Sequence, residues 1–386
     1  DEIGKGKPGF SKTRSIIEAA FYGNNVIEVV NLKQAYELAK NSPGTIVTDM
    51  PVYRGEEFGL KKDTKVLLFN DGSVTGRCAA ARRIAGSPDV DTNDLDLKVM
   101  DAIYDTRKKT MYHAEVYIGL DPEFMVKAHL LIPEGEENIL YSWMLNFQYE
   151  SDEYNKMYKK SRAIGSESDI YIFSDPQWSH PEHPLGLTYF NTQTNCAALL
   201  GMRYFGEHKK GTLTIAWAIA NRNGYASCHG GQKEYRLSPN HSYVASFFGL
   251  SGSGKSTLTH AVHNNKSGTI TQSLLKSLHD DAFIINTETG SSIAMEPTYF
   301  DKTSDYPTGC EDNRYLLTAQ NCSATRDDKG DVVLVTEDIR NGNGRAIKSK
   351  LWSPNRVDKI ESPVNGIFWI MKDPTIPPII KVNGSH

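Results

Sequence analysis

Residues 247–257 read Phe-Phe-Gly-Leu-Ser-Gly-Ser-Gly-Lys-Ser-Thr, and this stretch decides the fold of the chain around it. The preceding residues 242–248 are rich in β-branched and aromatic side chains, which predicts a β-strand. The residues from Lys255 to Val262 predict the start of a helix. A strand, a glycine-rich turn and a helix in this order are typical of a phosphate-binding loop, so the sequence predicts binding of a nucleoside triphosphate.

The glycines of this loop indicate how it would bind phosphate. Gly249, Gly252 and Gly254 let the backbone turn with positive φ and direct successive N–H groups inward. Lys255 is expected to reach the terminal phosphates, and the Ser256 hydroxyl to ligate the accompanying Mg²⁺. The expected nucleotide contacts from the loop are Gly249, Leu250, Ser251, Gly252, Ser253, Gly254, Lys255, Ser256 and Thr257. The alternative is a glycine-rich turn before an ordinary helix. It is disfavoured because the sequence matches the whole motif and is flanked by a predicted strand and a predicted helix, as a phosphate-binding loop requires.

Composition points to a soluble globular protein. The chain has 386 residues and a formal net charge of -4, which allows two domains and predicts neither a nucleic-acid partner nor a membrane. No secretory signal or membrane-length apolar run is present, so we expect a cytoplasmic location. The five cysteines are scattered and never form a Cys-x-x-Cys pair, which fits a reducing compartment without disulfides or a zinc knuckle.

The order of predicted elements indicates an α/β protein that is rich in sheet. Residues 32–40 have helical spacing with Asn31 as the expected N-cap. Short apolar runs bounded by turn residues predict strands at 66–69, 115–118, 130–132, 169–173, 332–335 and 367–370. The polar span 150–168 predicts a charged helix or excursion, and the best boundary between two domains lies at residues 222–224.

Several charged motifs surround the loop in a defined order. They are Thr-Gly-Arg at 75–77, Tyr-Phe-Gly-Glu-His-Lys-Lys-Gly at 204–211, Ala-Ser-Cys-His at 226–229, Asp-Asp at 280–281 and Thr-Glu-Asp-Ile-Arg at 336–340. Together with the loop, this series resembles the ATP-dependent phosphoenolpyruvate carboxykinases. The resemblance runs from about Thr75 to about Pro378.

The resemblance implies a fold and a reaction. The expected architecture is a two-domain, carboxykinase-like α/β fold, with a mixed-sheet substrate-side domain at residues 1–224 and a nucleotide- and metal-binding domain at 225–386 that contains the phosphate loop. The implied reaction, a step of gluconeogenesis, converts oxaloacetate and ATP to phosphoenolpyruvate, carbon dioxide and ADP. ATP, Mn²⁺ and Mg²⁺ are the implied cofactors.

The family's site residues carry over to matching positions of this chain. A lysine, a histidine and an aspartate hold manganese in the family, and they match Lys210, His229 and Asp281. Lys210 must be neutral to ligate, which requires burial beside another cation such as Lys209. The resemblance further assigns substrate-binding arginines at Arg77 and Arg340, an aromatic contact at Tyr204, metal-shell roles for Asp280 and Ser256, and nucleotide contacts at Glu296 and Lys302.

Each motif also has a plainer reading when it is taken alone. Taken alone, His229 would be interpreted as a structural or exposed histidine. Lys209 and Lys210 would be interpreted as a solvated charged pair, and Asp280 and Asp281 as part of a turn. For Arg77 the alternative is a surface basic cluster, and for Arg340 it is a loop salt bridge. The group His180-Pro181-Glu182-His183 is interpreted as a surface loop and not as a metal site. The presence of all the other motifs together favours the functional interpretation.

The chain departs from the family pattern at several places. Gly230-Gly231-Gln232 follows His229 where the family has Ser-Ala-Asn, and the segment 296–302 keeps only its end residues. The family's long section after the Pro-Pro turn, which supplies a mobile lid, is expected to be missing. An additional subunit that supplies this lid is therefore a possible partner.

Three hypotheses remain open on the sequence alone. The first is a carboxykinase-like enzyme acting on oxaloacetate. The second is an ATP-dependent phosphotransferase of the same fold with a different acceptor. The third is a non-catalytic nucleotide-binding subunit of a larger assembly, against which the retained carboxylate-binding and metal-binding residues argue.

Overall fold

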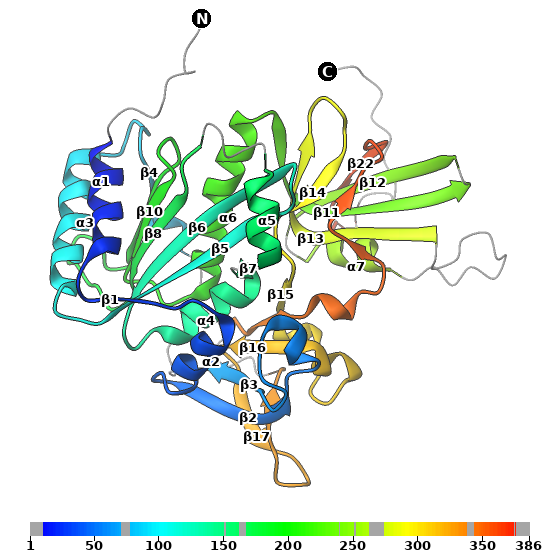
Figure 1. Cartoon of the computed structure of the whole chain (residues 1–386). Coiled ribbons are helices and arrows are strands. Elements are labelled where there is room, and N and C mark those ends of the chain that lie inside the picture. Colours follow the sequence, from blue (N-terminus) through cyan, green and yellow to red (C-terminus); the bar gives the residue numbers. More distant parts are fainter. Residues whose placement is uncertain are drawn as a thin grey trace, which may run out of the picture.

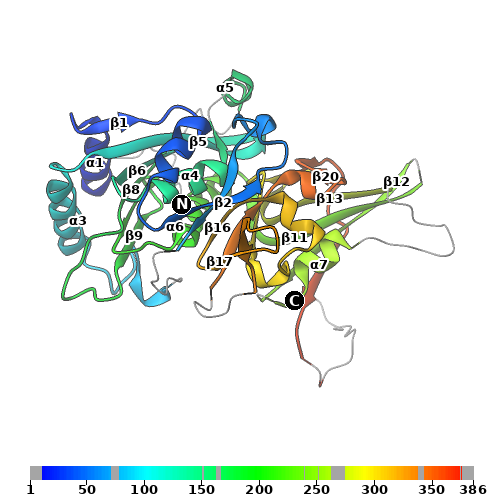
Figure 2. The same ribbon diagram turned by 90° about the horizontal axis from the view of Figure 1, so that it is seen from below.

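A computed structural model describes residues 11–70, 78–149, 152–161, 167–238, 240–250, 252–261, 274–337, 343–373 and 375. Its described part is a mixed α/β structure with three large sheets, as the sequence predicts. In both views the eight-stranded sheet with α1 (Lys12–Ala19) and α3 (Thr92–Thr106) occupies one end of the molecule (Figures 1 and 2). The strands β11 (Tyr225–Ser238), β12 (His241–Gly249) and β13 (Leu275–Asn286) extend at the other end.

The eight-stranded sheet has the order β1-β5-β6-β8-β10-β9-β4, with β7 paired to β5. Its strands are β1 (Val26–Glu28), β4 (Arg82–Ile84), β5 (Met111–Asp121), β6 (Phe124–Pro133), β7 (Gln148–Tyr149), β8 (Ile170–Asp175), β9 (Leu187–Asn191) and β10 (Cys196–Leu200). Successive side chains of a strand point to opposite faces. Leu131 accordingly joins the core beneath α1 and α3, while Leu130 joins the core around α4 (Glu137–Asn146) and α6 (Phe205–Arg222).

The seven-stranded sheet carries the phosphate loop. Its order is β21-β14-β13-β11-β12-β22, with β20 paired to β13. The shorter strands are β14 (Ser292–Ala294), β20 (Arg356–Val357), β21 (Lys359–Ile360) and β22 (Gly366–Ile370). The helix α7 (Lys255–His260) packs on β11 so closely that a Cβ at Gly231 would lie 1.8 Å from Thr259 Oγ1. Glycine at this departure from the family pattern therefore permits the close packing of α7.

The five-stranded sheet joins distant parts of the chain. Its order is β15-β19-β16-β3-β2, from β2 (Thr45–Pro51), β3 (Lys65–Phe69), β15 (Tyr299–Lys302), β16 (Leu316–Gln320) and β19 (Arg345–Lys348). β3 pairs in parallel with β16, with Leu67 opposite Thr318. Segments before and after residue 224 thus share one sheet, and the division into domains at that residue stays a prediction.

The remaining described elements are short. They are the hairpin of β17 (Ser323–Arg326) with β18 (Val332–Val335), the helices α2 (Leu32–Lys40) and α5 (Asp152–Lys159), and the 3-10 helices Ala20–Tyr22, Gly55–Phe58, Ala79–Ala81, Thr303–Asp305, Glu311–Tyr315 and Lys350–Trp352. None of the described helices has both the length and the apolar character needed to cross a bilayer.

Most local predictions from the sequence are confirmed. The predicted helix at 32–40 is α2, and the Asn31 side chain caps it by accepting a 2.8 Å hydrogen bond from the Gln34 N–H. The predicted strands correspond to β3, β5, β6, β8, β12, β18 and β22. Part of the polar span 150–168 forms the charged helix α5.

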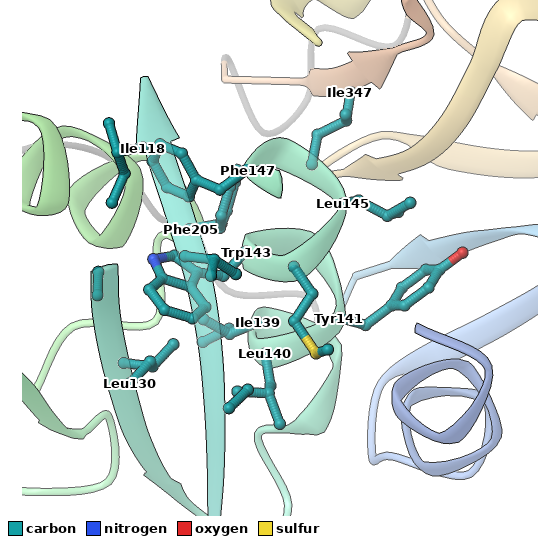
Figure 3. Packing of buried hydrophobic residues seen from close by; sticks show 14 of the residues in the cluster. Ile118, Leu130, Ile139, Leu140, Tyr141, Trp143, Leu145, Phe147, Phe205 and Ile347 are labelled. Carbon is teal, nitrogen blue, oxygen red and sulfur yellow. The ribbon is translucent and has the colours of Figure 1, made fainter. Parts of the chain in front are cut away.

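Helix α4 is the centre of the largest core. All ten of its residues are buried, as expected for a helix that is covered on every side. Figure 3 shows Trp143 and Phe147 near Phe205, Ile118 and Leu130, while Leu145 and Ile347 lie on another side of the helix. The Trp143 indole also donates a 3.0 Å hydrogen bond to Thr212 Oγ1 of α6. One helix therefore holds the eight-stranded and five-stranded sheets together.

Replacement of Trp143 by alanine tests this role. Because the side chain is 0% exposed, Trp143→Ala should lower the free energy of unfolding by about 3–5 kcal/mol through lost burial and a cavity. Trp369→Ala is the matched control, since Trp369 is 76% exposed, and it should change stability by no more than about 0.5 kcal/mol. Urea denaturation measures both, and equal losses would contradict the central role of α4.

Candidate active site

Two adjacent lysines at the start of α6 point in different directions. Neighbouring residues on a helix are turned by about 100° from each other. Lys209 is therefore fully buried, while Lys210 lines a cavity. Tyr204 precedes the helix and lines the same cavity, and its ring lies over Gly206, where a Cβ would come within 2.4 Å of that ring. The Tyr-x-Gly spacing of the motif is explained by this contact.

Asp281 binds both lysines. Its Oδ2 lies 2.9 Å from Lys209 Nζ and 2.5 Å from Lys210 Nζ, and its Oδ1 lies 2.6 Å from His229 Nε2. The backbone of Asp281 has φ +85°, an unfavourable conformation for a residue with a Cβ. It lies where the pairing of β11 with β13 shifts register. This irregularity in the strand directs the carboxylate toward three cationic or nitrogen-bearing side chains from two other elements.

The charges of this group shift the pKa values of its members. Burial alone would raise the pKa of the Asp281 carboxyl, but Lys209 and Lys210 outweigh burial and hold that pKa well below its usual value. Burial lowers the pKa of Lys210, and the charge of Lys209 lowers it further. Burial would also lower the pKa of Lys209, but Asp281 and Glu296 outweigh burial and raise it. Of the two lysines, Lys210 is thus the one that more easily becomes neutral.

Lys210, His229 and Asp281 together offer an amine nitrogen, an imidazole nitrogen and carboxylate oxygens at one place. This donor set fits a divalent transition metal such as manganese. His229 is presented from β11, where it pairs in register with Ala282 of β13. The next residue, Gly230, leaves no room for a side chain, because a Cβ there would lie 2.4 Å from the Phe247 carbonyl oxygen. Both glycines of the Gly-Gly departure, Gly230 and Gly231, therefore have a packing reason.

Two of the three loop glycines expected to have positive φ do have it. The third, Gly249, ends β12 without positive φ, and glycine is needed there because a Cβ would lie 2.3 Å from the Ile370 carbonyl oxygen. Gly252 and Gly254 have φ of 79° and 101°, and Gly254 is the N-cap of α7. The Lys255 ammonium donates hydrogen bonds to the carbonyl oxygens of Gly249 at 2.9 Å and Leu250 at 3.2 Å. The side chain of Lys255 thus lies along the loop and faces the same cavity.

One cavity of about 630 Å³ brings most of the predicted residues together. The predicted residues that line it are Tyr204, Lys210, His229, Gly249, Leu250, Gly252, Gly254, Lys255, Ser256, Thr257, Asp281 and Lys302. They come from the start of α6, from strands of the seven-stranded sheet, from the phosphate loop and the start of α7, and from β15 of the five-stranded sheet. The phosphate loop and the predicted metal ligands therefore share one space.

Other predicted residues lie elsewhere. Glu296, expected to contact the nucleotide, is fully buried, pairs with Lys209 at 2.9 Å and accepts a 2.6 Å hydrogen bond from Asn146 Nδ2. This corrects the expected position of Glu296, because its carboxylate pairs with the buried Lys209 and does not line the cavity. Lys209 and Ser253 do not line the cavity either. Arg77, Ser251, Arg340 and the side chain of Asp280 lie outside the described residues.

The cavity also contains residues that the sequence interpretation missed. They are Gly206, Tyr299, Phe300, Asp301, Asp305 and Arg345. Tyr299, Phe300 and Asp301 share β15 with the predicted residue Lys302, so the same strand brings them to the cavity wall. Arg345 is the first residue of β19 and comes five residues after Arg340 in the sequence. Its closeness in sequence to a predicted substrate-binding arginine is the signal that could have identified it as a site residue.

Comparison with known proteins identifies a family that this chain resembles. A family model described as Phosphoenolpyruvate carboxykinase matches residues 38–295. Phosphoenolpyruvate carboxykinase (ATP) of Dictyostelium discoideum is 26% identical over 215 residues, which cover 51% of this chain and 36% of the relative. The protein of that name from Eremothecium gossypii is 24% identical over 251 residues, 60% of this chain and 44% of the relative. The chain thus spans less than half the length of each of these two curated relatives.

Removal of the buried ammonium tests the charge arrangement. Lys209→Met should lower the free energy of unfolding by about 3–5 kcal/mol, because it leaves the buried carboxylate of Glu296 without its cation. Lys210→Met on the same helix is the control and should cost clearly less, because Lys209 and His229 still bind Asp281. Adding Glu296→Gln to Lys209→Met should recover part of the loss. Equal urea midpoints for the two lysine variants would refute this assignment.

Proposed function

This chain belongs to the phosphoenolpyruvate carboxykinase family, and we propose that it catalyses the metal-dependent conversion of oxaloacetate and ATP to phosphoenolpyruvate, carbon dioxide and ADP. The observation that carries the proposal is the single cavity that contains both the phosphate loop and the group Lys210, His229 and Asp281. Such a metal-ligating group beside the loop supports a metal-dependent reaction over a role in nucleotide binding alone.

The metal-binding part of the proposal uses three side chains. Lys210, His229 and Asp281 would hold Mn²⁺, and Ser256 would ligate the Mg²⁺ that accompanies the nucleotide. A divalent cation here supplies positive charge where decarboxylation develops negative charge on the substrate. Lys209 has a positioning role, because it holds the Asp281 carboxylate in place from the buried side.

The remaining residues bind the two substrates. The loop backbone and Lys255 hold the phosphates of ATP, and Lys302 adds another cation to the cavity wall. Tyr204 contacts the substrate carboxylate that leaves, and Arg77 and Arg340 grip the carboxylates. Arg345 lies on the cavity wall. We propose it as a further anion-binding group, because a guanidinium can donate two parallel hydrogen bonds to one phosphate or carboxylate.

An additional subunit or segment would close the cavity. Leu250 of the phosphate loop is 85% exposed and Trp369 of the adjacent strand β22 is 76% exposed, and Ile367, Phe368 and Met371 at the same edge are also exposed. Apolar side chains grouped in this way are typical of a surface that another polypeptide covers. Such a cover would exclude water, which otherwise protonates the enolate and diverts the reaction to pyruvate. A cytoplasmic location remains a prediction.

Product analysis tests the proposed function. The purified chain is incubated with oxaloacetate, ATP and Mn²⁺, with and without candidate partners, and the products are identified. Phosphoenolpyruvate is the expected product, and Lys255→Ala should abolish it by removing nucleotide binding. Pyruvate alone would show decarboxylation without transfer, and phosphate transfer to another acceptor would favour the phosphotransferase. Nucleotide binding without any turnover would favour the non-catalytic subunit.

His229→Ala tests the metal assignment separately. The variant should need more than about 10-fold higher Mn²⁺ for half-maximal activity, because one of three protein ligands is lost. Nucleotide affinity should stay within about 2-fold, since His229 has no place in the phosphate loop. His180→Ala, in the loop between β8 and β9, is the matched control and should behave as the parent. An unchanged Mn²⁺ requirement of His229→Ala would make the metal assignment wrong.

A further inference from the structure

A second group of metal-ligating side chains lies on the eight-stranded sheet. His113 and Glu115 are two residues apart on β5 and therefore point to the same face. His129 of β6 is the direct cross-strand partner of Glu115. The ligand atoms of these three side chains lie within 4.8 Å of one another.

This group is separate from the candidate active site. Met111 and Leu131, which share the strand faces of His113 and His129, belong to the core beneath α1 and α3. Ala114 and Leu130, which point the other way, belong to the core around α4 and α6. The group therefore lies on the opposite face of the sheet from α6, which carries Lys210.

Carboxylates fix the direction in which both imidazoles present their lone pairs. His113 Nδ1 lies 2.7 Å from Glu28 Oε1, and His129 Nε2 lies 3.0 Å from Asp169 Oδ2. An ionised carboxylate only accepts hydrogen bonds, so these two outer nitrogens are the donors. In a neutral imidazole the other nitrogen then carries a lone pair. The inner nitrogens His113 Nε2 and His129 Nδ1 face each other at 3.0 Å.

Three electron-rich atoms therefore meet at one point. Glu115 Oε1 lies 3.3 Å from His129 Nδ1, next to the contact between the two rings. Lys127 binds the other oxygen, Oε2, at 3.0 Å and leaves Oε1 directed at the histidines. Lone pairs at this spacing repel each other unless a proton or a metal ion lies between them, and a metal ion bound here would replace the proton shared by the two rings. We propose that His113, His129 and Glu115 form a binding site for a divalent transition-metal ion of the zinc type.

The spacing and the surroundings fit such an ion. Tetrahedral ligands about 2.0–2.1 Å from zinc lie about 3.3 Å from one another, close to the 3.0 and 3.3 Å observed between these atoms. In protein metal sites, a histidine ligand usually donates its other ring N–H to a carboxylate, which orients the imidazole. Glu28 and Asp169 provide it here for both rings.

The site is rigid but open to solvent. The Tyr171 ring stacks on His129 with centroids 4.3 Å apart, and the Phe21 ring packs edge-on against His113 at 5.2 Å. The Glu115 side chain is 26% exposed, so an ion and a water molecule as fourth ligand can reach the site. A metal here would tie β5 to β6, and through the carboxylates of Glu28 and Asp169 also to β1 and the start of β8.

Cobalt binding to the full chain tests the site, because four-coordinate Co²⁺ absorbs visible light much more strongly than six-coordinate Co²⁺. After treatment with a chelator, the protein should take up one equivalent of Co²⁺ with the strong spectrum, and Zn²⁺ should displace it. His129→Gln should abolish this spectrum. Asp169→Asn, which keeps all three ligands, should weaken binding by about 10- to 100-fold.

Two controls separate this site from others. His183→Ala changes the other described histidine group, His180, Glu182 and His183, and should leave the cobalt spectrum unchanged. Asp281→Asn, which alters the active-site ligands, should also retain it. If His129→Gln does not fold, as judged by circular dichroism, Glu115→Gln serves as the second ligand variant and should lose the spectrum. The absence of a strong spectrum in the parent chain, or its loss only in Asp281→Asn, would overturn the proposal.

Discussion

The ammonium group of Lys209 is the constraint on which the site depends. It is fully buried between Asp281 of β13 and Glu296 after β14, at 2.9 Å from each, and Asn146 at the end of α4 binds Glu296 in turn. A buried charge is tolerated only when it is paired and hydrogen-bonded. The start of α6, the seven-stranded sheet and the central helix must therefore meet at this point, and the cavity forms beside it.

This constraint also explains the unusual backbone of Asp281. A φ of +85° costs free energy, and it persists because three partners hold the carboxylate from two sides. Lys209 is the buried partner, while Lys210 and His229 reach the same carboxylate from the cavity. The fold thus separates two adjacent lysines by function: one neutralises buried carboxylates, and the other remains available to the cavity with a lowered pKa.

Local patterns predicted local structure well, because their causes are local. The cap of α2 by Asn31, the alternation of the strands and the glycines of the phosphate loop depend on neighbours in sequence. The sequence also predicted most of the residues that line the cavity, because they belong to motifs with residue types suited to binding phosphate and metal ions. It could not place Glu296, because the Lys209 that buries it comes from another element far away in the chain. Nor could it show that β3 pairs with β16, since that pairing joins residues about 250 positions apart.

The two groups of ligands differ in what surrounds them. In the cavity, Asp281 is already neutralised by two lysines, so a metal ion there has to displace Lys210 from the carboxylate and replace its proton. On β5 and β6 the outer carboxylates turn the inner nitrogens of both imidazoles toward each other, so a metal ion there would replace a shared proton and would displace no ammonium group. The ion proposed for β5 and β6 would lie on the face of the eight-stranded sheet opposite α6, and it would therefore not compete with the ion proposed for the cavity.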